Sequence, residues 1–218
     1  MIVLGLTGSI GMGKSTVAAM METMRIPVHD ADACVHSLLE PDSPARPALA
    51  AAFPYFDHQN LYDKKTKTLK RKELGALVFK DASARERLES ILHPLVRKSQ
   101  LEFLRASQRK GVEIACLDIP LLFEKGADQY LDYTLSVSAP YNIQRQRVLA
   151  RPGMTETRFQ AILQTQMPDT EKRTLADYVI PTGAGRAYTM QALKSALLNI
   201  RAKETPPAPK KIAEEELA

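Results

Sequence analysis

The sequence has no tryptophan, only two cysteines and no hydrophobic run long enough to span a membrane. Because Cys34 and Cys116 lie far apart and form no CxxC pair, we expect neither a disulfide framework nor a zinc site, and a reducing cytoplasm suits the protein. The apolar residues 1–6 run directly into a polar stretch, far short of the about 18 residues of a transmembrane helix, and no basic segment precedes them. We therefore expect neither a membrane anchor nor a signal peptide.

Aromatic residues are also scarce, at 6% of the 218 residues, whereas the formal net charge is +5. A positive surface attracts polyanions, a class that includes nucleic acids, anionic lipids and free nucleotides. Proteins that bind single-stranded nucleic acid usually offer aromatic side chains as stacking platforms, which this composition supplies poorly. The composition therefore favours an anionic partner and argues against nucleic acid.

What the sequence does contain is an alternation of short apolar strands with amphipathic helices, which predicts an α/β fold with a parallel sheet. Residues 1–6 are predicted as the first strand and residues 13–24 as the first helix. Residues 42–110 are first Pro/Ala-rich, then Lys-rich and then strongly helical, which indicates an inserted helical subdomain. Further strands are predicted at 27–29, 112–119, 133–137 and 178–181, and further helices at 33–39, 141–150 and 187–200. The strongly helical part of the insert contains residues 84–92 and 94–109.

The strongest motif is the stretch from Gly8 to Ser15, which satisfies the pattern GxxxxGK[ST] between a predicted strand and a predicted helix. Glycines let the backbone wrap closely around phosphate oxygens, and the helix that follows adds its positive end. The Lys14 ammonium would neutralise the β- and γ-phosphates of ATP, and the Ser15 hydroxyl can bind Mg²⁺. The predicted ATP site consists of Gly8, Gly11, Met12, Gly13, Lys14, Ser15 and Thr16.

Charged residues follow the predicted strands at the sheet edge where α/β proteins bind ligands. Asp32, two residues after Asp30, could orient an acceptor hydroxyl and take its proton, or it could cap the next helix. Asp118 ends a strand where P-loop proteins keep an acid near the metal, although a turn residue would also fit there. Arg147 and Arg151 could clamp the transferred phosphoryl group if one helix carries both, but exposed arginines at this spacing are common.

With these residues assembled, the chain resembles the dephospho-CoA kinase family from Met1 to about Ile200. Leu69-Lys70-Arg71 resembles the family's pattern in the insert. The principal matching blocks are Leu6 to Thr16, Asp30-Ala31-Asp32, His93-Pro94-Leu95-Val96, Leu117 to Glu124, and Gln166-Met167-Pro168 with residues 176–180. The third and fourth blocks discriminate best, because many families share a phosphate loop. The resemblance implies that ATP phosphorylates the ribose 3′-hydroxyl of dephospho-CoA, the last step of coenzyme A synthesis.

The resemblance also implies a P-loop NTPase three-layer fold with a helical substrate-binding insert and a helical lid. Its implied parts are a core at residues 1–41, 111–144 and 177–202, a CoA-binding insert at 42–110 and a lid at 145–176. The proline-rich and charged composition of the end of the chain predicts a disordered tail at 203–218. It implies that Lys14, Asp32 and Arg147 are catalytic, with Asp32 as the base, and that Arg147 and Arg151 contact the nucleotide phosphates. The residues implied to bind dephospho-CoA are Asp32, Arg71, His93 and Asp118.

Three positions depart from the family's pattern. Ser9 replaces a second glycine of the loop, which is tolerable if its backbone angle φ is negative. His36 stands where an arginine commonly follows the acidic element, and this puts one phosphate or substrate contact in doubt. Thr182 lies where the family tends to show Asn-x-Gly, which leaves the contacts to adenine open.

Two other functions stay open at this point. A nucleoside monophosphate kinase would share the loop and the lid, but Asp30 and Asp32 would repel a phosphate acceptor. A nucleotide-dependent switch or a nucleic-acid-binding module is the other, and the basic run at residues 64–72 would serve it. A pyrophosphate-bearing substrate or a solvated loop explains that run as well.

Overall fold

The computed structural model describes residues 1–64, 66 and 68–203 of the chain. These residues divide into two compact units. The sheet unit consists of residues 1–29 and the described residues from Ala106 on, and the helical unit consists of Asp30–Arg105. The tail predicted at 203–218 lies, except for Lys203, outside the described residues.

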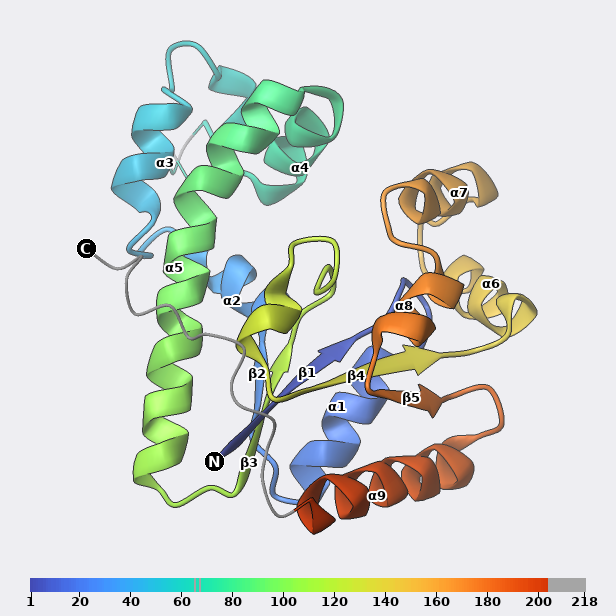
Figure 1. The fold of residues 1–218 in the computed structure, drawn as a ribbon. Helices are drawn as coiled ribbons and strands as arrows, with labels where there is room; N and C mark the ends of the chain where they lie inside the picture. Colours follow the sequence, from blue (N-terminus) through green and yellow to red (C-terminus); the bar gives the residue numbers. More distant parts are fainter. Residues whose placement is uncertain (65, 67, 204–218) are drawn as a thin grey trace. The chain divides into compact units, whose positions relative to one another are not determined.

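The sheet unit is built on a five-stranded sheet in the order β2-β3-β1-β4-β5 (Figure 1). β1 pairs in parallel with β3 and β4, and β4 pairs in parallel with β5, which confirms the predicted α/β fold. Strands β3 and β4 are buried throughout, as expected where helices cover both faces of a sheet. The strands are β1 (Ile2–Thr7), β2 (Val28–Asp30), β3 (Ile114–Asp118), β4 (Tyr133–Ser138) and β5 (Tyr178–Pro181).

Parallel pairing aligns the carboxyl ends of β1 and β3, where the register places Leu6 opposite Asp118. At this edge β1 continues into the phosphate loop, residues 8–13, and then into α1 (Lys14–Thr23). Ligands of open α/β sheets bind at this edge. The topology thus brings Lys14 and Asp118 together although 104 positions separate them in the sequence.

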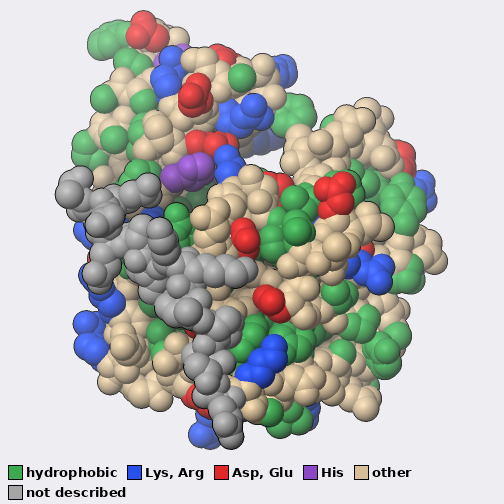
Figure 2. Space-filling view, viewed as in Figure 1, with side chains coloured by type: hydrophobic (Ala, Val, Ile, Leu, Met, Phe, Trp, Pro, Cys, Tyr) green, Lys and Arg blue, Asp and Glu red, His purple; other side chains and the backbone are tan. Residues whose placement is uncertain are grey.

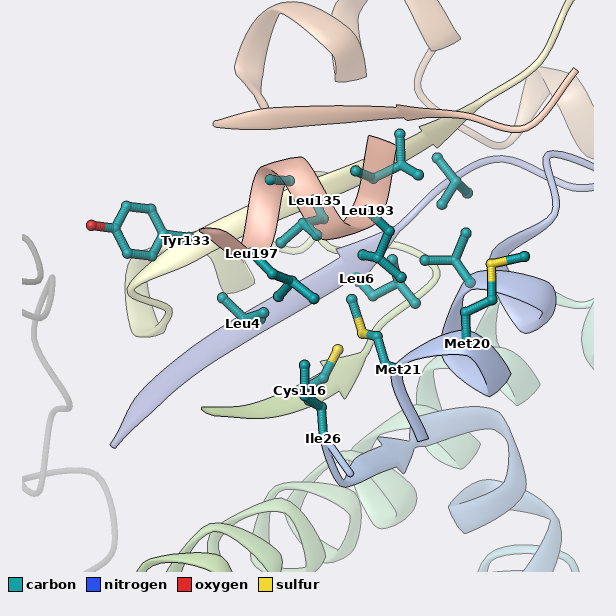
Figure 3. Packing of buried hydrophobic residues seen from close by; sticks show 14 of the residues in the cluster. Leu4, Leu6, Met20, Met21, Ile26, Cys116, Tyr133, Leu135, Leu193 and Leu197 are labelled. Carbon is teal, nitrogen blue, oxygen red and sulfur yellow. The ribbon is translucent and has the colours of Figure 1, made fainter. Parts of the chain in front are cut away.

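The core of the sheet unit lies where α1 and α9 (Arg186–Ala202) pack against the strands. Met21 of α1 and Leu193 and Leu197 of α9 gather around Leu4 and Leu6 of β1 (Figure 3). Full burial of a side chain of this kind contributes roughly 1.5–3 kcal/mol, so this cluster fixes α1, and with it the phosphate loop, on the sheet. The apolar face predicted for the last helix is confirmed, because Leu193, Leu197 and Ile200 are all buried.

Three helices between β4 and β5 occupy the region predicted as a lid. They are α6 (Tyr141–Leu149), α7 (Glu156–Gln164) and α8 (Asp169–Leu175). Tyr141 of α6 stacks on the buried Phe159 of α7, with ring centroids 6.1 Å apart. Thr155 caps α7 by accepting a hydrogen bond from the Arg158 N–H. A short 3₁₀ helix, η2 (Ala127–Tyr130), lies between β3 and β4.

The helical unit has a hydrophobic core of its own, which includes Leu49, Phe53, Leu61, Leu74 and Leu92. Its helices are α2 (Ala31–Leu38), α3 (Arg46–Ala52), η1 (Gln59–Leu61), α4 (Arg71–Lys80) and the greater part of α5 (Ala82–Arg109). The boundaries of the unit fall earlier in the chain, at both ends, than those of the predicted insert at 42–110.

The strongly helical stretch predicted to contain residues 84–92 and 94–109 is confirmed. α5 is a single helix of 28 residues with Pro94 inside it. A proline in a helix interior removes one backbone hydrogen bond and is normally unfavourable. On either side of Pro94, the side chains of Leu92 and Leu95 pack into the core of the helical unit, which helps to hold the helix continuous.

The two cysteines lie in different units, and both thiols are free. Cys116 in β3 belongs to the core of the sheet unit (Figure 3), and burial raises the pKa of its thiol. Cys34 in α2 is only partly buried.

No helix among the described residues is long and apolar enough to cross a membrane. Figure 2 shows Lys and Arg side chains scattered among Asp, Glu and uncharged side chains on the visible part of the described residues.

Candidate active site

The phosphate loop has the backbone conformation that its glycines allow. Gly11 and Gly13 have φ angles of 77° and 93°, in the left-handed region that other residues rarely adopt. A Cβ atom at Gly13 would also lie 3.1 Å from Thr182 Oγ1. In the described part of the chain, Arg25 is the one non-glycine residue with a positive φ. The φ angle of Ser9 is therefore negative, which is the condition for a serine to replace the family's second glycine.

Residues 13–16 form the start of α1, with Gly13 as its N-cap. No side chain caps this helix, and the first N–H groups of α1 are the donors that a phosphate can use. Ser15 is exposed in this turn, so its hydroxyl is available as a ligand. The Met12 side chain is buried in the core, so any contact of Met12 with a nucleotide involves its backbone.

The Lys14 ammonium forms an ion pair with the carboxylate of Asp118 at the end of β3. Asp118 is buried, with 3% of its surface exposed, and the Lys14 side chain is 17% exposed. Asp118 therefore lies beside the lysine that sequence analysis assigns to the β- and γ-phosphates. A carboxylate in this position can hold the ammonium until phosphate oxygens compete for it.

Two glutamines form hydrogen bonds with the backbone of Ile10 in the phosphate loop. Gln144 Nε2 donates to the Ile10 carbonyl at 2.8 Å, and the Ile10 N–H donates to Gln166 Oε1 at 3.0 Å. Gln144 belongs to α6, and Gln166 lies between α7 and α8. No sequence motif assigns a role to either side chain, although Gln166 opens one of the blocks on which the family resemblance rests. The loop is therefore tied directly to the segment predicted as a lid.

Arg147 connects the phosphate loop with the end of β5. Its guanidinium donates to Thr182 Oγ1 at 3.1 Å and to the Thr182 carbonyl at 2.6 Å, and it lies 3.5 Å from the Gly11 carbonyl. Thr182 is buried, and its hydroxyl donates to the Met12 carbonyl. Thr182, which departs from the family's pattern, therefore positions both the loop and Arg147.

Arg151 does not share a helix face with Arg147. α6 ends at Leu149, and Arg151 lies in the turn that follows, where Pro152 and Gly153 (φ 72°) stop the helix. The clamp predicted for the case that one helix carries both arginines therefore does not form. Arg151 is exposed in this turn.

A buried ion pair connects the predicted lid with the loop after β3. Lys172 Nζ of α8 lies 2.8 Å from Glu124 Oε1, and the Met167 N–H donates to the same carboxylate oxygen at 2.9 Å. Burial alone would raise the pKa of Glu124, but the Lys172 ammonium and the Met167 N–H more than offset it, and the pKa lies below its ordinary value. Glu124 is therefore charged at neutral pH and holds the end of the lid segment.

The remaining predicted site residues belong to the helical unit and are described within it. Asp30 is the N-cap of α2, since its Oδ1 accepts a hydrogen bond from the Ala33 N–H at 3.0 Å. Asp32 is exposed in the first turn of α2, so the alternative that Asp32 is the cap is wrong. His93 of α5 is 59% exposed, and its Nε2 lies 3.9 Å from Glu89 Oε2. His36 is exposed in the last turn of α2.

Arg71 lies at the start of α4. Its Nη1 is 3.3 Å from Glu40 Oε1, and both side chains are about half exposed, at 49% and 56%. A salt bridge this exposed contributes little to stability. The Arg71 guanidinium therefore remains available to an anionic ligand.

Among the residues that the structure describes, no three His, Cys, Asp or Glu side chains gather into a metal cage. Mg²⁺ is commonly held by substrate phosphates together with one or two protein oxygens. The exposed hydroxyl of Ser15, next to Lys14 at the start of α1, suits such a partial site. The arrangement can therefore hold an Mg²⁺–nucleotide complex.

Comparisons with known proteins agree with this chemistry. The sequence profile described as dephospho-CoA kinase matches residues 2–186. A dephospho-CoA kinase from Novosphingobium aromaticivorans is 50% identical over 201 residues, which cover 92% of this chain and 96% of the relative.

Solved structures show the same likeness. A crystal structure from Thermus thermophilus has a TM-score of 0.78 and 35% identity, covering 91% of this chain and 96% of the other. A dephospho-CoA kinase from Campylobacter jejuni has a TM-score of 0.65 and 26% identity over the same shares of the two chains.

Proposed function

This chain belongs to the dephospho-CoA kinase family, and from that premise we propose that it transfers the γ-phosphoryl group of ATP to the ribose 3′-hydroxyl of dephospho-CoA. The observation that carries the proposal is the family match over residues 2–186, which includes a phosphate loop with its lysine beside Asp118.

The phosphate loop and the first turn of α1 bind the triphosphate of ATP. The N–H groups of residues 13–16 donate to phosphate oxygens, and Lys14 moves from Asp118 to the β- and γ-phosphates. Ser15 supplies a hydroxyl ligand for Mg²⁺, which when bound neutralises charge on the β- and γ-oxygens. Asp118 balances the charge of Lys14 and keeps its ammonium at the sheet edge.

Asp32 orients the acceptor hydroxyl and takes its proton. The 3′-oxygen attacks the γ-phosphorus while the bond from that phosphorus to the β–γ bridging oxygen breaks, and ADP leaves with the bonding electrons. The hydroxyl proton passes to the Asp32 carboxylate. The exposed position of Asp32 in the first turn of α2, and the use of Asp30 as the cap, leave its carboxylate available for this role.

Arg147 and Arg151 stabilise negative charge on the transferred group. The Arg147 guanidinium already contacts the Gly11 carbonyl of the phosphate loop and donates to the Thr182 carbonyl. Arg151 lies in the turn after α6, within the predicted lid segment 145–176. Closure of that segment would exclude water, so that ATP is not hydrolysed without acceptor. We place the enzyme in the cytoplasm, where its two free thiols are stable.

The nucleoside monophosphate kinase alternative is disfavoured by chemistry as well as by family. An acceptor phosphate has no proton that must be removed, and the carboxylates of Asp30 and Asp32 would repel it. A nucleic-acid-dependent switch is disfavoured by the scarcity of aromatic residues, 6% of the chain. We therefore propose no nucleic-acid partner.

Coupled release of ADP from Mg²⁺-ATP tests the proposal, with dephospho-CoA, AMP or adenosine as acceptor. We expect dephospho-CoA to stimulate ADP release, and Asp32→Asn to abolish that stimulation while ATP still binds. Stimulation by AMP alone would instead assign the enzyme to the nucleoside monophosphate kinases. ATP hydrolysis that proceeds equally fast without any acceptor would contradict the role of the lid.

A further inference from the structure

Glu124, to which the proposed mechanism assigns no role, lies in the turn segment 119–126 that follows β3. Its Oε1 accepts a hydrogen bond from the Met167 N–H at 2.9 Å, in the stretch between α7 and α8. The side chain is only 17% exposed, and its carboxylate is charged at neutral pH. Because a charged acceptor forms a stronger hydrogen bond than a neutral one, Glu124 holds the backbone at Met167 firmly.

Met167 directly follows Gln166, and the side chain of Gln166 reaches the phosphate loop. Gln166 Oε1 accepts the hydrogen bond of the Ile10 N–H at 3.0 Å. The amide can accept this bond only when its own backbone lies at the right distance from the loop. A single peptide unit, about 3.8 Å between Cα atoms, separates the backbone that Glu124 holds from the residue that Ile10 uses. The position of Met167 therefore controls the bond to Ile10.

The backbone leaves α7 just before this point. The N–H groups of Thr165 and Gln166 still bond to carbonyls in the last turn of α7. Met167 is the next residue, and its N–H donates to Glu124 instead of to the helix. Glu124 therefore sets the direction in which the chain continues from α7 towards α8.

Lys172 of α8 in turn holds the carboxylate of Glu124. Its ammonium lies 2.8 Å from Glu124 Oε1, and its side chain is fully buried. The same ammonium donates to the Pro120 carbonyl at 3.3 Å, and this carbonyl also accepts a hydrogen bond from the Thr7 hydroxyl at 3.1 Å. Thr7 is the last residue of β1 and directly precedes Gly8 of the phosphate loop. Lys172 is therefore anchored near the start of the loop as well as to Glu124.

Stability alone does not account for this arrangement. A buried ion pair can often be replaced by apolar side chains of similar volume without loss of stability. Such side chains would fill the space of Glu124 and Lys172, but they could not accept the Met167 N–H. Beyond packing, the carboxylate thus contributes the placement of one backbone N–H and, through it, of Gln166.

We propose that Glu124 is a positioning residue of the ATP site. It holds Met167, so that Gln166 keeps the Ile10 N–H in the conformation in which the phosphate loop binds the triphosphate, and Lys172 keeps Glu124 in place. This inference rests on the proposed function, because it takes ATP as the ligand of the loop. It extends the ATP site beyond the loop itself, to the turn segment after β3 and to α8.

Two double variants separate the effect of the acceptor from that of the charges. Glu124→Leu/Lys172→Met removes both buried charges and also the acceptor of the Met167 N–H. Glu124→Gln/Lys172→Met removes the same charges but keeps an amide oxygen that can accept this N–H. Neither variant leaves a buried charge without its partner, so both should fold.

Asp177→Ala is the control for the loss of a carboxylate acceptor in the same unit. Asp177 Oδ2 accepts hydrogen bonds from the N–H and the hydroxyl of Thr134 at 2.7 Å and 2.8 Å. Thr134 is the second residue of β4, near the strand end opposite to the phosphate loop. Asp177→Ala should therefore destabilise the sheet unit and leave the ATP site unchanged.

The readouts are the Kd for ATP from titration calorimetry, the KM values for ATP and dephospho-CoA, and kcat, with urea denaturation to confirm folding. We expect Glu124→Leu/Lys172→Met to raise the Kd and the KM for ATP about tenfold, the effect of losing one hydrogen bond of the loop. The kcat and the KM for dephospho-CoA should not change, because the bond supports the loop equally before and during phosphoryl transfer. Glu124→Gln/Lys172→Met and Asp177→Ala should bind ATP as the wild type does. Adding Gln166→Ala to Glu124→Leu/Lys172→Met should raise the Kd no further, because both changes break the same bond.

Three results would overturn the inference and leave the proposed function standing. If Glu124→Leu/Lys172→Met binds ATP as tightly as the wild type, Glu124 serves stability only. If the two double variants weaken ATP binding equally, the charges act and the acceptor does not. If Gln166→Ala adds a further tenfold loss, Glu124 does not act through Gln166. If instead the wild type binds ATP but does not phosphorylate dephospho-CoA, the proposed function fails, and the Kd values for ATP still decide the role of Glu124.

Discussion

Lys172 Nζ lies 2.8 Å from Glu124 Oε1, and the Lys172 side chain is fully buried. The ammonium also donates to the Pro120 carbonyl at 3.3 Å. Both interactions connect α8 with the loop after β3, which begins at the strand end that carries Asp118. Because water cannot reach this ammonium, the Glu124 carboxylate must compensate for the free energy of burying its charge.

Glu124→Gln should therefore destabilise the protein by about 3–5 kcal/mol, because it leaves a buried positive charge without its partner. Urea denaturation at pH 7 measures the change. As a control, Arg145→Ala removes an exposed ion pair with Glu156 in the same region and should change the free energy of unfolding by less than about 1 kcal/mol.

The double variant Glu124→Gln/Lys172→Met removes both charges. We expect it to be more stable than Glu124→Gln alone, because no charge remains buried. If Glu124→Gln and the double variant are equally stable, the unpaired charge of Lys172 is not the reason why Glu124→Gln destabilises the protein.

The same pair predicts a dependence of stability on pH. The pKa of Glu124 is lower in the folded protein than its ordinary value of 4.5. The stabilisation is therefore complete above about pH 4.5 and is lost as the pH falls through the folded-state pKa. The difference in urea midpoint between wild type and Glu124→Gln should shrink on going from pH 7 to pH 3, and a constant difference would contradict this explanation.

Gln166→Ala should weaken the binding of ATP. The substitution leaves the Ile10 N–H of the phosphate loop without its acceptor, and the loss of such a bond is equivalent to about a tenfold rise in KM for ATP. KM for dephospho-CoA should not change. Gln160→Ala is the matched control, because Gln160 lies in α7 and its Nε2 donates to Tyr141 of α6 and to Glu156 of α7.

Arg147→Ala should lower kcat/KM for ATP about a hundredfold, the usual effect of losing one donor to charge that develops in a transition state. The same substitution at Arg145, two residues earlier on α6, should have little effect, since that side chain pairs with Glu156 instead. Steady-state kinetics with both variants separates the two roles. If Arg147→Ala and Arg145→Ala have equal activities, Arg147 only positions Thr182 and does not stabilise the transferred group.

Much of the fold follows from local sequence patterns. β1, α1, β4 and the last helix are found where apolar periodicity and glycine punctuation place them, because each buries one continuous apolar face. The helical stretch predicted around residues 84–109 is also confirmed, although Pro94 lies inside the helix α5. A proline is a local signal against a helix, and packing of the neighbouring leucines in a tertiary core overrides it.

The candidate site is predictable only in part. The phosphate loop is a continuous motif, and in the structure it leads into α1, where Lys14 and Ser15 form the first turn and Lys14 pairs with Asp118. The bonds from Gln144 and Gln166 to Ile10 join residues 134 and 156 positions apart, so neither glutamine stands out in its own sequence window. The cap of α2 is Asp30 rather than Asp32, a difference that depends on where one helix begins.

The placement of the cysteines makes the two units separately observable. A thiol reagent reaches a buried sulfur only when the surrounding structure opens, so the rate of labelling reports the local opening equilibrium. Cys116 in the core of the sheet unit should react only on extensive opening of the sheet, whereas the partly exposed Cys34 reports on the helical unit. The native chain therefore carries one chemical reporter for each unit, without any engineered label.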